Sequence, residues 1–142
     1  MIKDNINENA KKIDNFLKSY LKKQNNSLLI EPMKYGTLNG GKKIRSSIII
    51  NVGKIFNIRA NKLLHICGAV ECIHSYSLIH DDLPCMDNDS IRRGKPSTHI
   101  KFGESTAILA GNSLLTLAFE LIADKKYKIQ SQKKTELVSQ IA

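Results

Sequence analysis

Cysteine is scarce in this 142-residue sequence, which contains only Cys67, Cys72 and Cys85. An odd and sparse set of thiols does not form a disulfide framework, and it favours a reducing compartment. Cys67 and Cys72 lie five residues apart with no matching second pair of Cys or His, which argues against a structural zinc site. We expect all three residues to be ordinary buried or loop thiols.

Aromatic residues are also few, at 6% of the chain, and no nucleic-acid-binding motif accompanies them. The net charge of +9 comes mostly from lysines that are scattered along the sequence. Such lysines are typical of solvated helix faces rather than of a nucleic-acid interface. We therefore expect no nucleic-acid partner.

Long apolar runs are missing as well. No run reaches the roughly 18 residues that a membrane span needs, and the polar stretch Met1–Ala10 has no apolar block of the kind found in signal peptides. These two features predict a cytoplasmic chain with no membrane span.

Helical spacing of apolar residues dominates the sequence, and no segment alternates as a half-buried strand would. The chain is one domain at most, with 42% hydrophobic residues to build a core. We predict an all-α fold with helices at 4–24, 31–38, 43–56, 61–83, 104–123 and 132–142, and loops at 24–27 and 87–96. The β-branched run Ile48–Ile50 is compatible with a strand, but its flanks favour a helix. Asn61 is expected to cap the fourth helix and Pro84 to end it.

The densest group of chemically active side chains lies at residues 80–95, HDDLPCMDNDSIRRGK. Four carboxylates within nine residues suit Mg²⁺, and the arginines after them suit phosphate oxygens as bidentate donors. Asp81 and Asp87 would lie on different faces of an ideal helix, so the chain after Pro84 has to fold back to bring them together. A solvated loop whose charges neutralise one another is the alternative. An EF-hand is excluded because its glycine and terminal Glu are missing.

Two further groups of residues could bind an anion. His74 lies two helical turns before Asp81 and shares its face, although for His74 taken by itself a partly buried structural histidine is the better interpretation. The segment Gly40–Arg45, GGKKIR, combines a freely rotating backbone with cations near a helix start. It is not a P-loop, because the spacing and the Ser or Thr after the lysine are absent.

These segments resemble the trans-prenyl diphosphate synthases, also called polyprenyl synthetases. GGKKIR is similar to the GGK-x-x-R motif of that family, and residues 69–93, AVECIHSYSLIHDDLPCMDNDSIRR, resemble its first aspartate-rich motif with the helix before it. The stretch from Gly94 to Asp124 continues the likeness, which covers roughly residues 30–124. It implies an isoprenoid-synthase-type helical bundle, of which this chain would be the N-terminal part.

The resemblance also implies roles for particular residues. Asp81 and Asp87 would ligate Mg²⁺ that bridges an allylic diphosphate, with Asp82 in support, and Arg92 would bind the same diphosphate. Lys42, Arg45, His74 and Arg93 would bind isopentenyl diphosphate. The family's reaction ionises the allylic substrate, dimethylallyl or geranyl diphosphate, to a carbocation and pyrophosphate, after which the alkene of isopentenyl diphosphate attacks and a proton is lost.

Chain length can be inferred from the same comparison. Tyr76 lies five residues before Asp81, about 7.5 Å along the helix axis, where an aromatic side chain in the family forms a floor that stops growth at C15. The resemblance therefore favours farnesyl diphosphate over the C20 product of a geranylgeranyl diphosphate synthase. An ordinary core aromatic is the alternative for Tyr76.

One feature of the family is missing. Its members are roughly twice this length and carry a second aspartate-rich motif, and no second DD pair follows Asp89. We expect a truncated or split chain that is weak or inactive alone and that forms a homodimer if complete. A non-catalytic partner subunit or remnant of a prenyl synthase is the remaining alternative.

Overall fold

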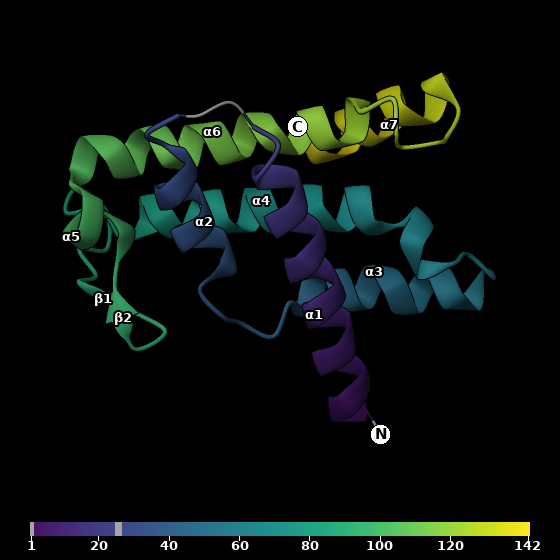
Figure 1. Cartoon of the computed structure of the whole chain (residues 1–142), viewed down its shortest axis with the longest axis horizontal. Coiled ribbons are helices and arrows are strands. Elements are labelled where there is room, and N and C mark those ends of the chain that lie inside the picture. The colour runs from purple at the N-terminus through teal and green to yellow at the C-terminus, as the bar shows by residue number, and fades with distance from the viewer. Residues whose placement is uncertain (1, 25–26) are drawn as a thin grey trace.

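The computed structural model describes residues 2–24 and 27–142 of the chain. The described part is helical apart from its loops and one small hairpin, so the all-α prediction is confirmed (Figure 1). In order, the elements are α1 (Ile2–Leu21), α2 (Ile30–Leu38), α3 (Ile44–Ile55), a 3₁₀ turn η1 (Ala60–Lys62), α4 (Leu64–Asp81), β1 (Ile91–Arg92), β2 (Lys95–Pro96), α5 (Thr98–Phe102), α6 (Glu104–Ala123) and α7 (Ser131–Ile141).

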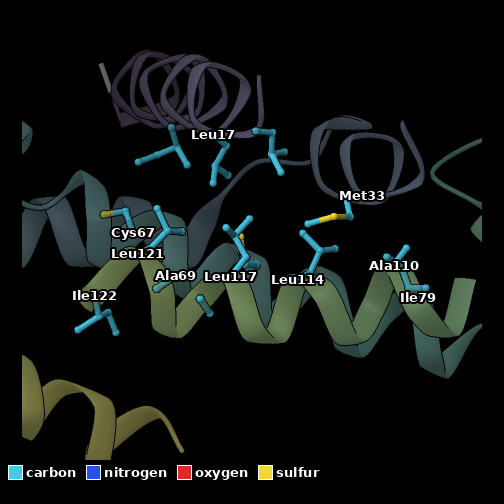
Figure 2. Close-up of a cluster of buried hydrophobic side chains, with 14 of the residues drawn as sticks. Leu17, Met33, Cys67, Ala69, Ile79, Ala110, Leu114, Leu117, Leu121 and Ile122 are labelled. Carbon is cyan, nitrogen blue, oxygen red and sulfur yellow. The ribbon is translucent and has the colours of Figure 1, made fainter. Parts of the chain in front are cut away.

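Helices α4 and α6 form the centre of the molecule and lie side by side along its long axis in Figure 1. Figure 2 shows that Leu114, Leu117 and Leu121 of α6 project towards Leu17 of α1 and Met33 of α2. All of these side chains are at most 5% exposed. Burial of each large apolar side chain contributes about 2 kcal/mol, so this shared core fixes α4, the helix that carries His74, Tyr76 and Asp81.

By length and composition alone, α6 could cross a membrane, so the expectation that no apolar run is long enough is wrong. Eight of its residues, including Ala107, Leu114 and Ile122, are nevertheless buried inside the fold, mainly against α4. This is the position of a core helix in a globular protein.

The β-branched run Ile48–Ile50 lies within α3, which confirms the helical interpretation. The prediction for Asn61 is wrong: this exposed residue lies inside η1, and α4 begins only at Leu64, with no side-chain cap. Helix α4 also ends earlier than predicted, at Asp81. Because Pro84 has no N–H, it cannot continue the helical ladder, and Leu83 N donates to His80 O in a tighter turn instead.

The polar loop predicted at 87–96 contains the hairpin β1–β2, and the short helix α5 was not predicted. Helix α5 has only five residues, too few for a recognisable apolar period. The turn predicted at 24–27 includes Asn25 and Asn26, which lie outside the described residues.

The thiol predictions are confirmed. Cys67 and Cys72 are free and buried, whereas Cys85 is free and exposed. Burial raises the pKa of Cys67 to about 12 and that of Cys72 to about 12, so neither is a reactive thiolate at neutral pH.

Candidate functional site

The acidic end of α4 is built by a tight reversal of the chain. Asp87 N donates to Asp81 O at 2.8 Å, and Asn88 N donates to Leu83 O at 3.0 Å. Asn88 adopts φ 55°, a left-handed conformation that asparagine tolerates better than most residues. The reversal brings Asp87 back to the end of the helix beside Asp81, as the six-residue spacing requires.

The side chains of Asp81 and Asp87 make no hydrogen bond or ion pair with other described residues. Asp81 is half-buried and Asp87 is exposed, and neither carboxylate has a hydrogen-bond or ion-pair partner among the described residues. Two unpaired carboxylates at one helix end make a negative site that is free to accept a cation.

Asp82 is different, because it is buried and fully engaged by Arg92. Arg92 Nε lies 2.8 Å from Oδ1 and 2.7 Å from Oδ2 of Asp82, and Arg92 Nη2 also bonds Oδ1. The side chain of Asp82 is 2% exposed and that of Arg92 is 32% exposed. The hydrogen bond to Asp82 raises the pKa of the Arg92 guanidinium. Asp82 therefore holds Arg92 in place, and its carboxylate does not face solvent.

The hairpin gives both arginines their positions. In β1–β2, Arg92 pairs with Lys95 across a two-residue turn of Arg93 and Gly94, whose φ angles are 54° and 73°. Positive φ at both central residues defines the type I′ geometry that suits a right-twisted hairpin. With this turn, the side chain of Arg92 contacts Asp82, and that of Arg93 contacts the glycine loop, residues 39–43 between α2 and α3.

The glycine loop is hydrogen-bonded to Arg93. Arg93 Nη1 donates to Gly40 O at 2.6 Å. Gly41 has φ 98°, and a Cβ on it would lie 2.7 Å from the guanidinium carbon of Arg93. The backbone conformation therefore favours glycine at this position, and a side chain here would have to displace the Arg93 guanidinium.

The structure brings His74 and two of the predicted cations into one neighbourhood. Burial lowers the pKa of His74, and the nearby charges of Arg45 and Arg93 lower it further. Arg45 lies on the first turn of α3 and is exposed. Lys42 is also exposed, but no hydrogen bond or ion pair among the described residues holds its side chain.

Sequence reasoning missed a buried charged pair beneath this neighbourhood. Lys43 and Glu71 have side chains 2% and 3% exposed, and Lys43 Nζ lies 4.0 Å from Glu71 Oε2. One signal was available, since Glu71 is the only acidic residue between Leu64 and His80, and apolar residues surround it in the sequence. A lone carboxylate in such a helix needs a buried partner.

Tyr76 lies half-buried on α4, one turn before the acidic end. Its ring centroid is 4.6 Å from that of His80, at an interplanar angle of 66°. His80 Nε2 in turn lies 3.1 Å from Ile108 O of α6. A side chain at Gly111 would overlap the His80 ring, so the bare glycine makes room for this contact.

The donor chemistry fits Mg²⁺, although the described residues contain no cluster of three or more His, Cys, Asp or Glu side chains that could hold a metal by themselves. Mg²⁺ commonly takes one or two protein carboxylates and completes its shell with water and phosphate oxygens. Asp81 and Asp87 supply such a pair, while Asp82 is already neutralised by Arg92. The arrangement suits a metal that arrives with a diphosphate.

A family model described as polyprenyl synthetase matches residues 26–142. The chain belongs to the polyprenyl synthetase family. It is 46% identical over 118 residues to the farnesyl diphosphate synthase of Escherichia coli K12, which covers 82% of this chain and 40% of the relative. It is 41% identical over 136 residues to the farnesyl diphosphate synthase of Bacillus subtilis, with 94% and 46% covered.

Solved structures of the polyprenyl synthetase family have the same fold. An FPP/GFPP synthase from Zymomonas mobilis superposes with a TM-score of 0.88 at 38% identity, covering 94% of this chain and 49% of that structure. A geranyltranstransferase from Thermotoga maritima gives a TM-score of 0.78 at 40% identity, with 83% and 44% covered. The chain thus spans about half the length of these relatives or less.

Proposed function

We propose that this chain supplies the two diphosphate-binding surfaces of a prenyltransferase that condenses isopentenyl diphosphate with dimethylallyl or geranyl diphosphate to give farnesyl diphosphate. The observation that carries the proposal is that two carboxylates without a protein partner, Asp81 and Asp87, lie at the helix end where Asp82 fixes Arg92. Opposite charges held this close to each other suit a metal-bridged diphosphate. The names of the similar farnesyl diphosphate synthases support the same reaction.

The allylic diphosphate belongs at the end of α4. Asp81 and Asp87 would hold Mg²⁺, which when bound neutralises charge on the departing pyrophosphate. Arg92 would donate to the diphosphate oxygens through the part of its guanidinium that Asp82 leaves free. Because Asp82 fixes this arginine before substrate arrives, little conformational freedom is lost when the diphosphate binds.

Isopentenyl diphosphate would bind at the neighbouring cluster of Arg45, His74 and Arg93, with the exposed Lys42 as a further donor. In the chain without ligand, burial lowers the pKa of His74 and favours the neutral imidazole, which can donate one hydrogen bond to a diphosphate. Arg45 and Arg93 carry the charge that a diphosphate requires. Attack of the alkene on the allylic carbon forms the new C–C bond, and loss of a proton restores the double bond.

Tyr76 would set the length of the product. It lies one turn below Asp81 with its ring braced against His80, and His80 reaches the backbone of α6. A braced aromatic ring resists displacement by a growing apolar chain better than a free one. We propose that this ring limits the product to C15.

The wider properties of the molecule belong to the same proposal. Residues 1–142 would form the N-terminal part of a polyprenyl synthetase domain, and the complete assembly would be a cytoplasmic, Mg²⁺-dependent homodimer.

A partner subunit is the second candidate function, and an exposed row on α3 favours it. Ile44, Ile48, Val52 and Ile55 recur at helical spacing and are 47–76% exposed. One similar protein, 50% identical over 93 residues, is named a heterodimeric geranylgeranyl pyrophosphate synthase large subunit from Arabidopsis thaliana. Co-purification of a second prenyl synthase chain with this one would favour the partner role.

A graft tests the enzymatic proposal. The 142-residue chain replaces the matching segment of the Escherichia coli farnesyl diphosphate synthase, and radiolabelled isopentenyl diphosphate is supplied with geranyl diphosphate. We expect a C15 product from the graft and much weaker synthesis from the isolated chain. A correctly folded graft that makes no prenyl product would refute the proposal, and robust C15 synthesis by the isolated chain would refute the expectation that it is weak alone.

Tyr76→Ala in the same graft tests whether the Tyr76 ring limits the length of the product. We expect the variant to extend the product from C15 to C20, because the cavity below Asp81 becomes deeper. Leu115→Ala is a matched truncation on α6 and should leave the C15 product unchanged. An unchanged C15 product from Tyr76→Ala would rule out Tyr76 as the floor.

A further inference from the structure

Helix α3 begins without a capping side chain of its own. Its N-cap residue Lys43 has φ 47°, and its side chain makes no bond to the first turn. The turn is bound from another helix, because Glu71 Oε1 accepts from Ser46 N at 3.3 Å and from Ser46 Oγ at 2.7 Å. A carboxylate at this position satisfies a free N–H and interacts favourably with the helix dipole. Glu71 of α4 therefore caps α3 across the fold.

The ammonium of Lys43 neutralises the buried cap and links it to two more helices. Lys43 Nζ lies 4.0 Å from Glu71 Oε2 and 3.5 Å from Asp14 Oδ1 of α1, and it donates to Thr37 O of α2 at 2.6 Å. A buried charge without such partners would destabilise the fold strongly. The two side chains thus join α1, α2, α3 and α4 at one point.

The position of the cation cluster, which consists of Arg45, His74 and Arg93, depends on this contact between Lys43 and Glu71. Arg45 lies between Lys43 and Ser46 on the first turn of α3, and His74 follows Glu71 by three residues on α4. Arg93 is bonded to Gly40, three residues before Lys43. A shift of the start of α3 relative to α4 would therefore separate Arg45 and Arg93 from His74.

We propose that Glu71 and Lys43 are positioning residues, which hold Arg45, His74 and Arg93 in register to bind a diphosphate. This inference rests on the proposed function, since the diphosphate is the anion that the cluster would bind. Neither residue needs to touch the ligand, because both are buried behind the cluster.

The charge of Glu71 makes the inference testable, because a positioning role and simple electrostatics predict opposite changes in diphosphate affinity when the charge is removed. Glu71 is an anion near an anion-binding cluster, so its charge alone opposes diphosphate binding, and its removal should strengthen binding on electrostatic grounds. A positioning role predicts the opposite result, weaker binding.

Glu71→Gln removes the charge and disturbs the geometry by a defined amount. The carboxylate has two acceptor oxygens, one for Ser46 and one facing Lys43. An amide has only one acceptor oxygen, so the variant must leave either Ser46 or Lys43 facing an N–H₂ group. In either orientation one contact that joins the start of α3 to α4 is lost, while the side-chain volume stays almost the same.

The experiment is a calorimetric titration of the folded 142-residue chain with inorganic pyrophosphate in the absence of metal. We expect Glu71→Gln to weaken binding by about tenfold, the cost of a lost charged hydrogen bond. The exposed residue Glu31, which bonds Lys34 on α2, provides the matched control, and Glu31→Gln should bind as the wild type does. Amide exchange of Ser46 should accelerate in Glu71→Gln and not in Glu31→Gln.

A double variant covers the case in which Glu71→Gln does not fold. Lys43→Met with Glu71→Gln removes both charges of the buried pair, and its net charge equals that of the wild type. The carboxylate of Asp14 loses Lys43 as its partner, but its side chain is 35% exposed and can be hydrated. Electrostatics alone predicts unchanged binding, whereas the loss of positioning predicts weaker binding. Unchanged or tighter binding in the folded variants would overturn the inference and leave the proposed function intact. A wild-type chain that binds no pyrophosphate would overturn the proposed function itself.

Discussion

At the scale of single residues, the candidate site depends on which carboxylates are neutralised and which are free. Asp82 is buried and bound to Arg92, whereas Asp81 and Asp87 have no such partner in the described part of the chain. The family resemblance gives Asp82 a supporting role beside Asp81 and Asp87, and the tertiary contact with Arg92 gives that role its physical basis. Asp82 organises an arginine, and the other two are available to a metal.

Asp82→Asn should therefore destabilise the fold. The substitution leaves the Arg92 guanidinium facing a neutral amide in a mostly buried site, and we expect a loss of about 2 kcal/mol in the free energy of unfolding, reduced from the fully buried case because Arg92 is 32% exposed. Urea denaturation measures the change. Asp89→Asn is the control, since Asp89 lies 3.8 Å from Arg92 and is 57% exposed, and it should change stability by less than about 0.5 kcal/mol. Equal effects of the two substitutions would contradict the assignment.

The ionisation of His74 reports on the cation cluster. Burial and then Arg45 lower its pKa below the ordinary value of about 6.5, so Arg45→Gln should raise it, as measured by NMR titration of the imidazole. His65, whose Nε2 lies 3.7 Å from Asp124 Oδ2, is the internal control and should titrate as before. A His74 pKa that does not respond would show that the two side chains are not neighbours.

The same lowered pKa has a consequence for stability. Below pH 6.5 the unfolded chain binds more protons at His74 and His65 than the folded chain does, because the pKa of each is lowered on folding. The contribution of these residues to stability is thus present above about pH 6.5 and is lost as the pH falls through their folded pKa values.

At the scale of helices, apolar patterning carried most of the information. Helix α6 has the bounds 104–123 that its apolar period predicts. The Ile48–Ile50 run is helical, as its flanking residues predict, and it lies in the middle of α3. The start of α4 could not be predicted, since the chain uses a 3₁₀ turn there instead of an asparagine cap. The cap of α3 by Glu71 was equally hidden, because it depends on how α3 and α4 pack together.

Gly111 tests the packing of α4 against α6. A glycine inside an uncrowded helix is normally improved by alanine, but here the added methyl would overlap His80. We expect Gly111→Ala to destabilise the fold by about 1–2 kcal/mol, measured by thermal unfolding. Asn112→Ala, at the exposed neighbouring position, should be neutral or slightly stabilising. Stabilisation by Gly111→Ala would mean that the two helices are less closely packed than described.

At the scale of the whole molecule, the fold and the site follow from the sequence to different extents. The helical bundle and the return of Asp87 to Asp81 were predictable from apolar spacing and Pro84. The buried pairs of Lys43 with Glu71 and of Arg92 with Asp82 were not, because each pair joins separate elements. The position of Glu71 in α4 signalled only that it needs a buried partner, and did not indicate which residue that is. Relatives are about twice as long, so the chemistry proposed here involves surfaces of this chain within a larger assembly.

The central claim is that Asp81 and Asp87 together hold magnesium against a diphosphate. A calorimetric titration of the grafted enzyme with inorganic pyrophosphate, with and without Mg²⁺, tests it most directly. In the unmodified graft, Mg²⁺ should tighten binding by at least about tenfold, and this gain should vanish in the variant carrying Asp81→Asn and Asp87→Asn. The same magnesium-dependent gain in that folded double variant would contradict the account.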